Sequence, residues 1–120
     1  VARDYVDGQY DGDPSRVASA LHPDLAKRAV REQPTARELA PLRRMSADEL
    51  IDTARLGVLK VPPSERKREI KVLDIAGNIA VVRVDTPFFV DFLELGRTGN
   101  RWLIVNALWW NKPQPSQPKE

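Results

Sequence analysis

Cysteine is absent from this 120-residue chain, and histidine occurs once, as His22. The lack of cysteine excludes disulfides, zinc–thiolate sites and thiol catalysis, and it leaves the cellular compartment open. A single histidine also excludes sites built from histidine pairs, so the residue types predict neither a metal site nor a cofactor. His22 precedes a proline at the predicted end of a helix, where we expect a structural contact with the helix carbonyls.

Long apolar runs and strong net charge are lacking as well. Asp91, Glu94 and Arg101 interrupt the longest apolar stretches, so no segment predicts a membrane span. The formal net charge is only +2, and basic and acidic residues are interleaved, which predicts no nucleic-acid surface. The remaining composition is that of a globular protein. We expect one domain over residues 1–112 and a disordered, proline-rich tail over residues 113–120.

Local signals predict three helices in the first half of the chain. Residues 1–10 have apolar positions at helical spacing. Asp13 followed by Pro14 is typical of a helix start. Ser46 and Glu49 have the spacing of a capping box, and Gly57 is expected to end that helix. A polar loop is expected over residues 31–36.

The second half of the chain predicts antiparallel strands. Residues 70–75 and 78–85 form a predicted hairpin around Gly77-Asn78. In the first half, residues 24–30 could be a short strand or a helical turn, and a strand is favoured. A final hairpin is predicted over residues 88–110. We therefore expect an α+β fold in which helices cover one face of a curved, mainly antiparallel sheet.

The final hairpin carries the most informative pattern. With Thr98-Gly99 as its two-residue turn, residues whose numbers sum to 197 lie opposite each other, which places Asp91 across from Asn106. Strand side chains alternate between the two faces. The face shared with this pair would carry Phe89, Leu93, Leu95, Trp102, Ile104, Leu108 and Trp110, and the other face Phe88, Val90, Phe92, Leu103, Val105 and Trp109.

A carboxylate and an amide in an apolar wall allow two interpretations. Asp91 is a candidate general base or hydrogen-bond acceptor, and Asn106 a candidate group for orienting a substrate. Alternatively, the two side chains are a satisfied structural pair. Tyr5 and Tyr10 either place their hydroxyls at a cavity mouth or pack in the core. The acidic residues Asp4, Asp7, Asp11 and Asp13 lack the spacing of a calcium loop and predict a solvated face.

Several segments carry a family resemblance: YVDGQYDGDPSRVASALHPDLAKR, MSADELI, VLDIAGNIAVVRV and WLIVNALW. Together they resemble the lumazine-binding family of the nuclear transport factor 2-like superfamily, which also contains ketosteroid isomerases and SnoaL-like proteins. The resemblance implies a cone in which three N-terminal helices pack on a strongly curved sheet around a cavity. It also implies a homodimer through the outer sheet face (Phe88, Val90, Phe92, Leu103, Val105 and Trp109).

Three functions are compatible with this pattern. The first is binding of a small apolar or aromatic molecule in a cavity lined by Tyr5, Tyr10, Phe89, Asp91, Leu93, Trp102, Ile104, Asn106, Leu108 and Trp110. The second is an isomerase, dehydratase or cyclase that uses Asp91 for acid–base chemistry. The third is a non-catalytic dimerisation or scaffold domain whose own side chains fill the cavity.

Overall fold

The computed structural model describes residues 1–30 and 40–113. Three helices and six strands make up this part of the chain, with a 3₁₀ turn at Pro63–Glu65. The helices are α1 (Ala2–Asp11), α2 (Pro14–Ala20) and α3 (Ala47–Arg55). The strands are β1 (Leu21–Ala29), β2 (Arg43–Met45), β3 (Glu69–Ala76), β4 (Ile79–Asp85), β5 (Phe89–Thr98) and β6 (Arg101–Asn111).

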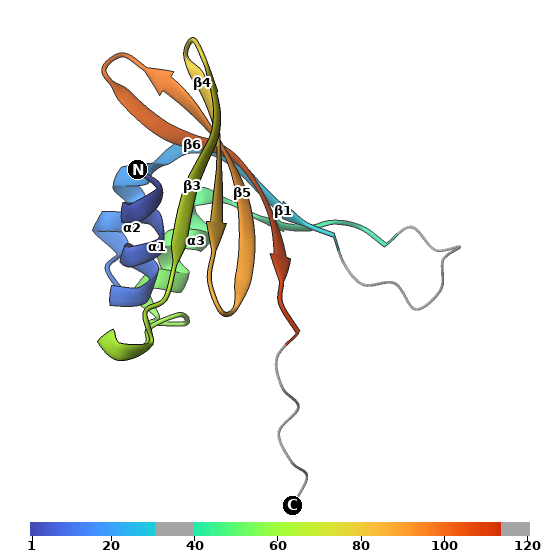
Figure 1. Ribbon diagram of the computed structural model, residues 1–120. Coiled ribbons are helices and arrows are strands. Elements are labelled where there is room, and N and C mark those ends of the chain that lie inside the picture. Colours follow the sequence, from blue (N-terminus) through green and yellow to red (C-terminus); the bar gives the residue numbers. More distant parts are fainter. Residues whose placement is uncertain (31–39, 114–120) are drawn as a thin grey trace, which may run out of the picture.

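The six strands form one strongly bent sheet in the order β2-β1-β6-β5-β4-β3. Only the β1–β6 pairing is parallel, so the predicted α+β class with a mainly antiparallel sheet is confirmed. All three helices lie on one side of the sheet (Figure 1). The core fills the space between the layers, where Val6 and Val17 from the helices meet Leu93 and Ile104 from the sheet.

The capping signals read from the sequence are present in the structure. Asp13 caps α2 by accepting a hydrogen bond from the backbone N–H of Arg16 at 3.1 Å. Ser46 and Glu49 form the capping box of α3, which ends at Arg55, before the expected Gly57. The loop predicted over residues 31–36 and, apart from Pro113, the tail predicted over 113–120 lie outside the described residues.

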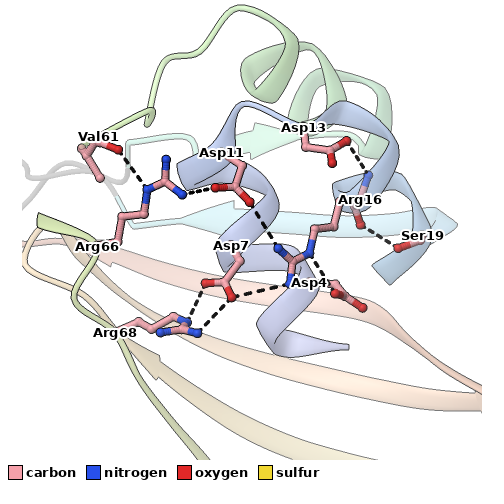
Figure 2. Close-up of polar contacts among 9 residues, drawn as sticks. All are labelled: Asp4, Asp7, Asp11, Asp13, Arg16, Ser19, Val61, Arg66 and Arg68. Atoms are coloured by element: carbon pink, nitrogen blue, oxygen red, sulfur yellow. Dashed lines mark hydrogen bonds and ion pairs between the residues drawn. The ribbon is translucent and has the colours of Figure 1, made fainter. Parts of the chain in front are cut away.

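The acidic face of α1 is occupied by arginines rather than by solvent alone (Figure 2). Arg16 of α2 contacts Asp4 and Asp11 at 3.0 and 3.2 Å, and Arg68, just before β3, contacts Asp7 at 2.6 Å. Arg66, Arg16 and Arg68 together join α1 to α2 and to the segment leading into β3. These contacts fix the rotation of α1, whose opposite face is buried in the core.

The register of the final hairpin differs from the prediction. Thr98 pairs with Arg101, so the turn is Gly99-Asn100 and not Thr98-Gly99. This shift of the turn changes the pairing by two residues and leaves the faces unchanged. A β-bulge at Val105, opposite the step from Glu94 to Leu95, then adds one residue to β6 and reverses the alternation beyond it.

The predicted Asp91–Asn106 pair is therefore wrong. Asp91 lies opposite Trp109, and Asn106 lies opposite Glu94 on the outer face. Leu108 and Trp110, predicted to point inward, are also on the outer face and are 48% and 58% exposed. Trp109, predicted to point outward, is only 7% exposed and belongs to the core.

The described residues contain no helix that combines the length and the apolar character needed to cross a membrane.

Gly8 of α1 lies where α1 and α2 approach each other closely, so replacing it tests how the two helices pack. A Cβ built at Gly8 would lie 2.7 Å from Val17 Cγ2 and 3.0 Å from the Val17 backbone nitrogen. Replacing glycine inside a helix by alanine ordinarily stabilises the helix by about 1 kcal/mol. Here Gly8→Ala is expected to destabilise the protein by about 1–3 kcal/mol, because α1 and α2 must separate.

Chemical denaturation of the Gly8→Ala variant measures this cost. Gly77→Ala is the control, since its Cβ would meet no atom within 4 Å and only the positive φ of 58° opposes it. A Gly8→Ala variant as stable as the wild type would show that the two helices do not approach this closely.

Candidate functional site

A buried polar cluster joins α1, β1 and β5 on the inner side of the sheet. Lys27 of β1 donates a hydrogen bond from Nζ to Asp91 Oδ2 of β5 at 3.1 Å. Tyr5 of α1 donates its hydroxyl to the same oxygen at 2.9 Å and accepts a hydrogen bond from Lys27 Nζ. Asp91 is completely buried and Lys27 is 7% exposed. An ion pair enclosed in the protein is thus linked to a tyrosine from the helical layer.

Local sequence places each of these side chains. Leu25, Lys27 and Ala29 alternate along β1 and all three are buried, so the lysine occupies a position on an apolar strand face. Asp91 occupies the same kind of position on β5, between the buried Phe89 and Leu93.

The surroundings of the cluster shift the pKa values of Lys27 and Tyr5. Burial lowers the pKa of Lys27; Asp91 opposes this effect, and the positive charge of Arg43 adds to it. Burial and the negative charge of Asp91 raise the pKa of Tyr5 well above its usual value, so the phenol stays protonated. Within the described residues, the buried Oδ1 atom of Asp91 has no hydrogen-bond partner.

Aromatic rings surround the Lys27 ammonium group. Nζ lies 4.9 Å from the ring centre of Trp109, 5.1 Å from that of Tyr5 and 5.7 Å from that of Phe89. The guanidinium carbon of Arg43 lies 5.6 Å from the ring centre of Trp109. These distances are those of cation–π interactions, so both basic groups converge on one tryptophan.

A cavity of about 210 Å³ opens beside this cluster. Four aromatic side chains line it: Tyr5, Phe88, Phe89 and Trp109. Lys27 and Arg43 supply positive charge, and Gln9, Thr53 and Asn111 supply uncharged polar groups. The cavity is mostly apolar with a few convergent polar groups, which is the usual character of a small-molecule site.

A second, larger hollow of about 420 Å³ lies farther along the inner face, near the start of α1. Trp102, Leu95 and Val82 are among its lining residues. Among the described residues that line it, Arg3 has the only charged side chain. We take the smaller cavity as the candidate site because polar groups that fix the orientation of a ligand gather there.

The residues predicted to form a site lie in five different places. Tyr5 and Phe89 line the cavity, and Asp91 lies behind it as the partner of Lys27. Leu93, Ile104 and Tyr10 are buried in the core, where the Tyr10 hydroxyl donates to the Lys67 carbonyl at 2.8 Å. Trp102 lines the second hollow. Asn106, Leu108 and Trp110 are on the opposite face of the sheet.

The structure also corrects the predicted positions of Phe88 and Trp109 and the predicted contact of His22. Two of the six residues assigned to the outer face, Phe88 and Trp109, line the cavity instead. The His22 ring does not cap a helix carbonyl but accepts a hydrogen bond from the Asp24 backbone N–H at 2.9 Å. The described residues contain no group of three or more His, Asp or Glu side chains arranged to hold a metal ion.

Sequence reasoning missed Lys27, Arg43 and Trp109. The alternation of Leu25, Lys27 and Ala29 could have identified Lys27 as an inward residue. The turn at Gly99-Asn100 repeats the dipeptide of the first hairpin, Gly77-Asn78, and could have corrected the register at the turn. No comparable signal places Trp109, because its orientation depends on the bulge.

Comparisons with known proteins give one family and several solved structures. A family model described as "Putative lumazine-binding" matches residues 1–110. A comparison with curated proteins gave no match.

The solved structures share the fold at low sequence identity. An NTF2-like protein of unknown function from Silicibacter pomeroyi DSS-3 is 18% identical, with a TM-score of 0.70 over 92% of this chain and 89% of that one. One from Shewanella baltica OS155 is 18% identical, with a TM-score of 0.66 over 94% and 89%. A ketosteroid isomerase-like protein from Erwinia carotovora atroseptica SCRI1043 is also 18% identical, with a TM-score of 0.63 over 94% and 92%.

The buried pair predicts a specific pattern of mutant stabilities. Lys27→Met leaves Asp91 buried without its counter-ion, and Asp91→Asn leaves Lys27 in the same situation. Each change is expected to lower the free energy of unfolding by about 3–5 kcal/mol. The double variant should be less destabilised than the sum of the two, because it leaves no uncompensated charge.

Urea unfolding at neutral pH provides the measurement for all three variants. Lys71→Met, at an exposed position of β3, is the control and should stay within about 0.5 kcal/mol of the wild type. Strictly additive effects at Lys27 and Asp91 would show that the two groups are not coupled.

Proposed function

The chain belongs to the family described as "Putative lumazine-binding", and we propose that it is a small-molecule-binding domain whose site is the cavity in front of Lys27. The observation that carries this proposal is the convergence of four aromatic rings and two basic groups on one cavity. Aromatic walls supply contact area, and the few polar groups fix the orientation of the bound molecule. At about 210 Å³ the cavity suits a molecule of one or two rings.

The geometry favours binding over acid–base catalysis by Asp91. Its Oδ2 atom already accepts hydrogen bonds from Tyr5 and Lys27, and the side chain is not among those that line the cavity. A general base must come within hydrogen-bond reach of the proton that it removes. A binding role requires only groups that face the cavity, and Lys27, Arg43 and the aromatic rings are among them.

A second copy of the chain is the proposed partner for the outer sheet face. Phe92 is 45% exposed there, next to Leu108 and Trp110 at 48% and 58%. Each such side chain would contribute about 1.5–3 kcal/mol if fully buried. The interface proposed from the structure is therefore centred on these three residues, with Val90 opposite Trp110 and with Leu103 and Val105 farther along β6. It excludes Phe88 and Trp109.

Filling the cavity tests the binding proposal. Thr53 of α3 lines the cavity at a half-buried position. Thr53→Trp is expected to place a ring in the space and to abolish retention of small aromatic compounds, with lumazine as one member of the set. Native mass spectrometry of the protein mixed with these compounds records which are retained.

Leu56→Trp is the matched control, since Leu56 follows α3 directly and is exposed. This variant should retain the same compounds as the wild type. Failure of the wild-type protein to retain any compound, or equal retention by Thr53→Trp, would contradict the proposal.

The dimer is tested on the outer face. Phe92→Glu places a charge at the centre of the proposed interface and is expected to give monomers in sedimentation-velocity ultracentrifugation. Ile75→Glu is the control, because Ile75 is an exposed apolar residue of β3 that lies in the second hollow on the inner face. A Phe92→Glu variant that sediments like the wild type would place the interface elsewhere or show that the wild type is monomeric.

A further inference from the structure

We propose that the ligand of the Lys27 cavity is an organic monoanion, a small planar aromatic carboxylate, bound with its charge between Lys27 and Arg43. This inference rests on the proposed binding function and specifies the chemistry of the ligand. Three observations support it: the charges that face the cavity, the position of Asp91 and the rings around Lys27.

The charged side chains that line the cavity are all of one sign. Lys27 and Arg43 are both present, and no aspartate or glutamate is among the described residues that line it. Both cationic groups lie within 6 Å of the Trp109 ring centre, and Arg43 lowers the pKa of Lys27 through its charge. Two like charges held this close repel each other, and an anion between them would relieve the repulsion.

Asp91 sets both the direction and the net charge of the site. It contacts Lys27 from behind the cavity, so the ion pair presents its positive end to the ligand. Counting Lys27 and Arg43 as positive and Asp91 as negative leaves a net charge of about +1. A monoanion such as a carboxylate would balance this charge, whereas a phosphate monoester with its second negative charge would not.

The aromatic groups argue against a cationic ligand. Rings around a cavity often bind quaternary ammonium compounds by cation–π interactions. Here the Lys27 ammonium already occupies the position in front of Tyr5, Phe89 and Trp109. A second cation would meet both Lys27 and Arg43. The remaining ring surface, which includes Phe88, is suited to stacking on a flat aromatic system.

A pair of matched probes tests the charge preference. 2-Naphthoate and 2-naphthamide have the same shape and differ in charge. Calorimetry at neutral pH is expected to show that the wild type binds the carboxylate about tenfold more tightly than the amide, because charge-assisted hydrogen bonds are stronger than neutral ones. Equal affinities, or no binding of either probe, would overturn the inference.

Two arginines that are adjacent in β2 provide the matched variants. Arg43→Met is expected to remove most of the carboxylate preference, so that the affinities for 2-naphthoate and 2-naphthamide become similar. Arg44 does not line the cavity, so Arg44→Met should leave both affinities within about twofold. An equal loss in the two variants would indicate an effect of overall charge and would contradict a site at Arg43.

The pH dependence supplies a second readout. Among the described residues, three charged or titratable groups face Lys27: Tyr5 from α1, Asp91 from β5 and Arg43 from β2. Arg43 stays protonated, and the raised pKa of Tyr5 keeps its phenol neutral. Affinity for 2-naphthoate is therefore expected to fall as the pH rises through the lowered pKa of Lys27, while 2-naphthamide affinity stays constant. A carboxylate affinity that falls with rising pH no more than the amide affinity does would remove Lys27 from the site.

The two proposals can fail separately. If both probes bind equally and Thr53→Trp blocks both, the cavity is a small-molecule site without a charge preference. If neither naphthalene probe binds but Thr53→Trp abolishes retention of other compounds, the binding function stands and the carboxylate class is wrong.

Discussion

The contact between Lys27 and Asp91 is the constraint on which the rest of the interior depends. It brings a charge from β1 to a charge from β5 across the intervening β6, and Tyr5 connects both to α1. Replacing a buried ion pair with apolar residues is often neutral or stabilising, so the pair is not explained by stability alone. Its position directly behind a cavity supports the proposed binding function, in which one end of the pair would meet a ligand. The same charges would be costly in a closed core.

The helices could be predicted because their signals are local. Asp13 and Ser46 each satisfy backbone groups within the next three residues, and such contacts do not depend on the tertiary structure. The final hairpin was harder, because Gly99 can serve as either residue of a two-residue turn. The structure uses Gly99 first, with a φ of 62°. The bulge at Val105 could not be predicted, because nothing in the types of the neighbouring residues separates it from regular strand.

The candidate site was predicted in part. Strand alternation placed Phe89 and Asp91 on the inner face of the sheet, although Asp91 lies behind the cavity and does not line it. Tyr5 lines the cavity, which is one of the two positions that helical spacing allowed. Trp109 lies beyond the bulge, and alternation counted from the turn assigned it to the wrong face. Lys27 was missed for a different reason. A lysine is ordinarily assigned to solvent, and its burial becomes reasonable only when Asp91 is known to lie within hydrogen-bond distance.

The irregular pairings have a consequence for how the shape of this protein is encoded. β6 has one residue more than β5 at Val105, and β3 has one more than β4 at Leu73. A surplus residue of this kind bends its strand and increases the local twist. Part of the curvature that makes room for the helices and the cavity therefore results from the different numbers of residues in neighbouring strands and does not depend on their side chains (Figure 1). Related chains could exchange most residues along these strands and keep the concave surface, whereas losing one residue from β6 would preserve the pairing and flatten the surface on which the cavity rests.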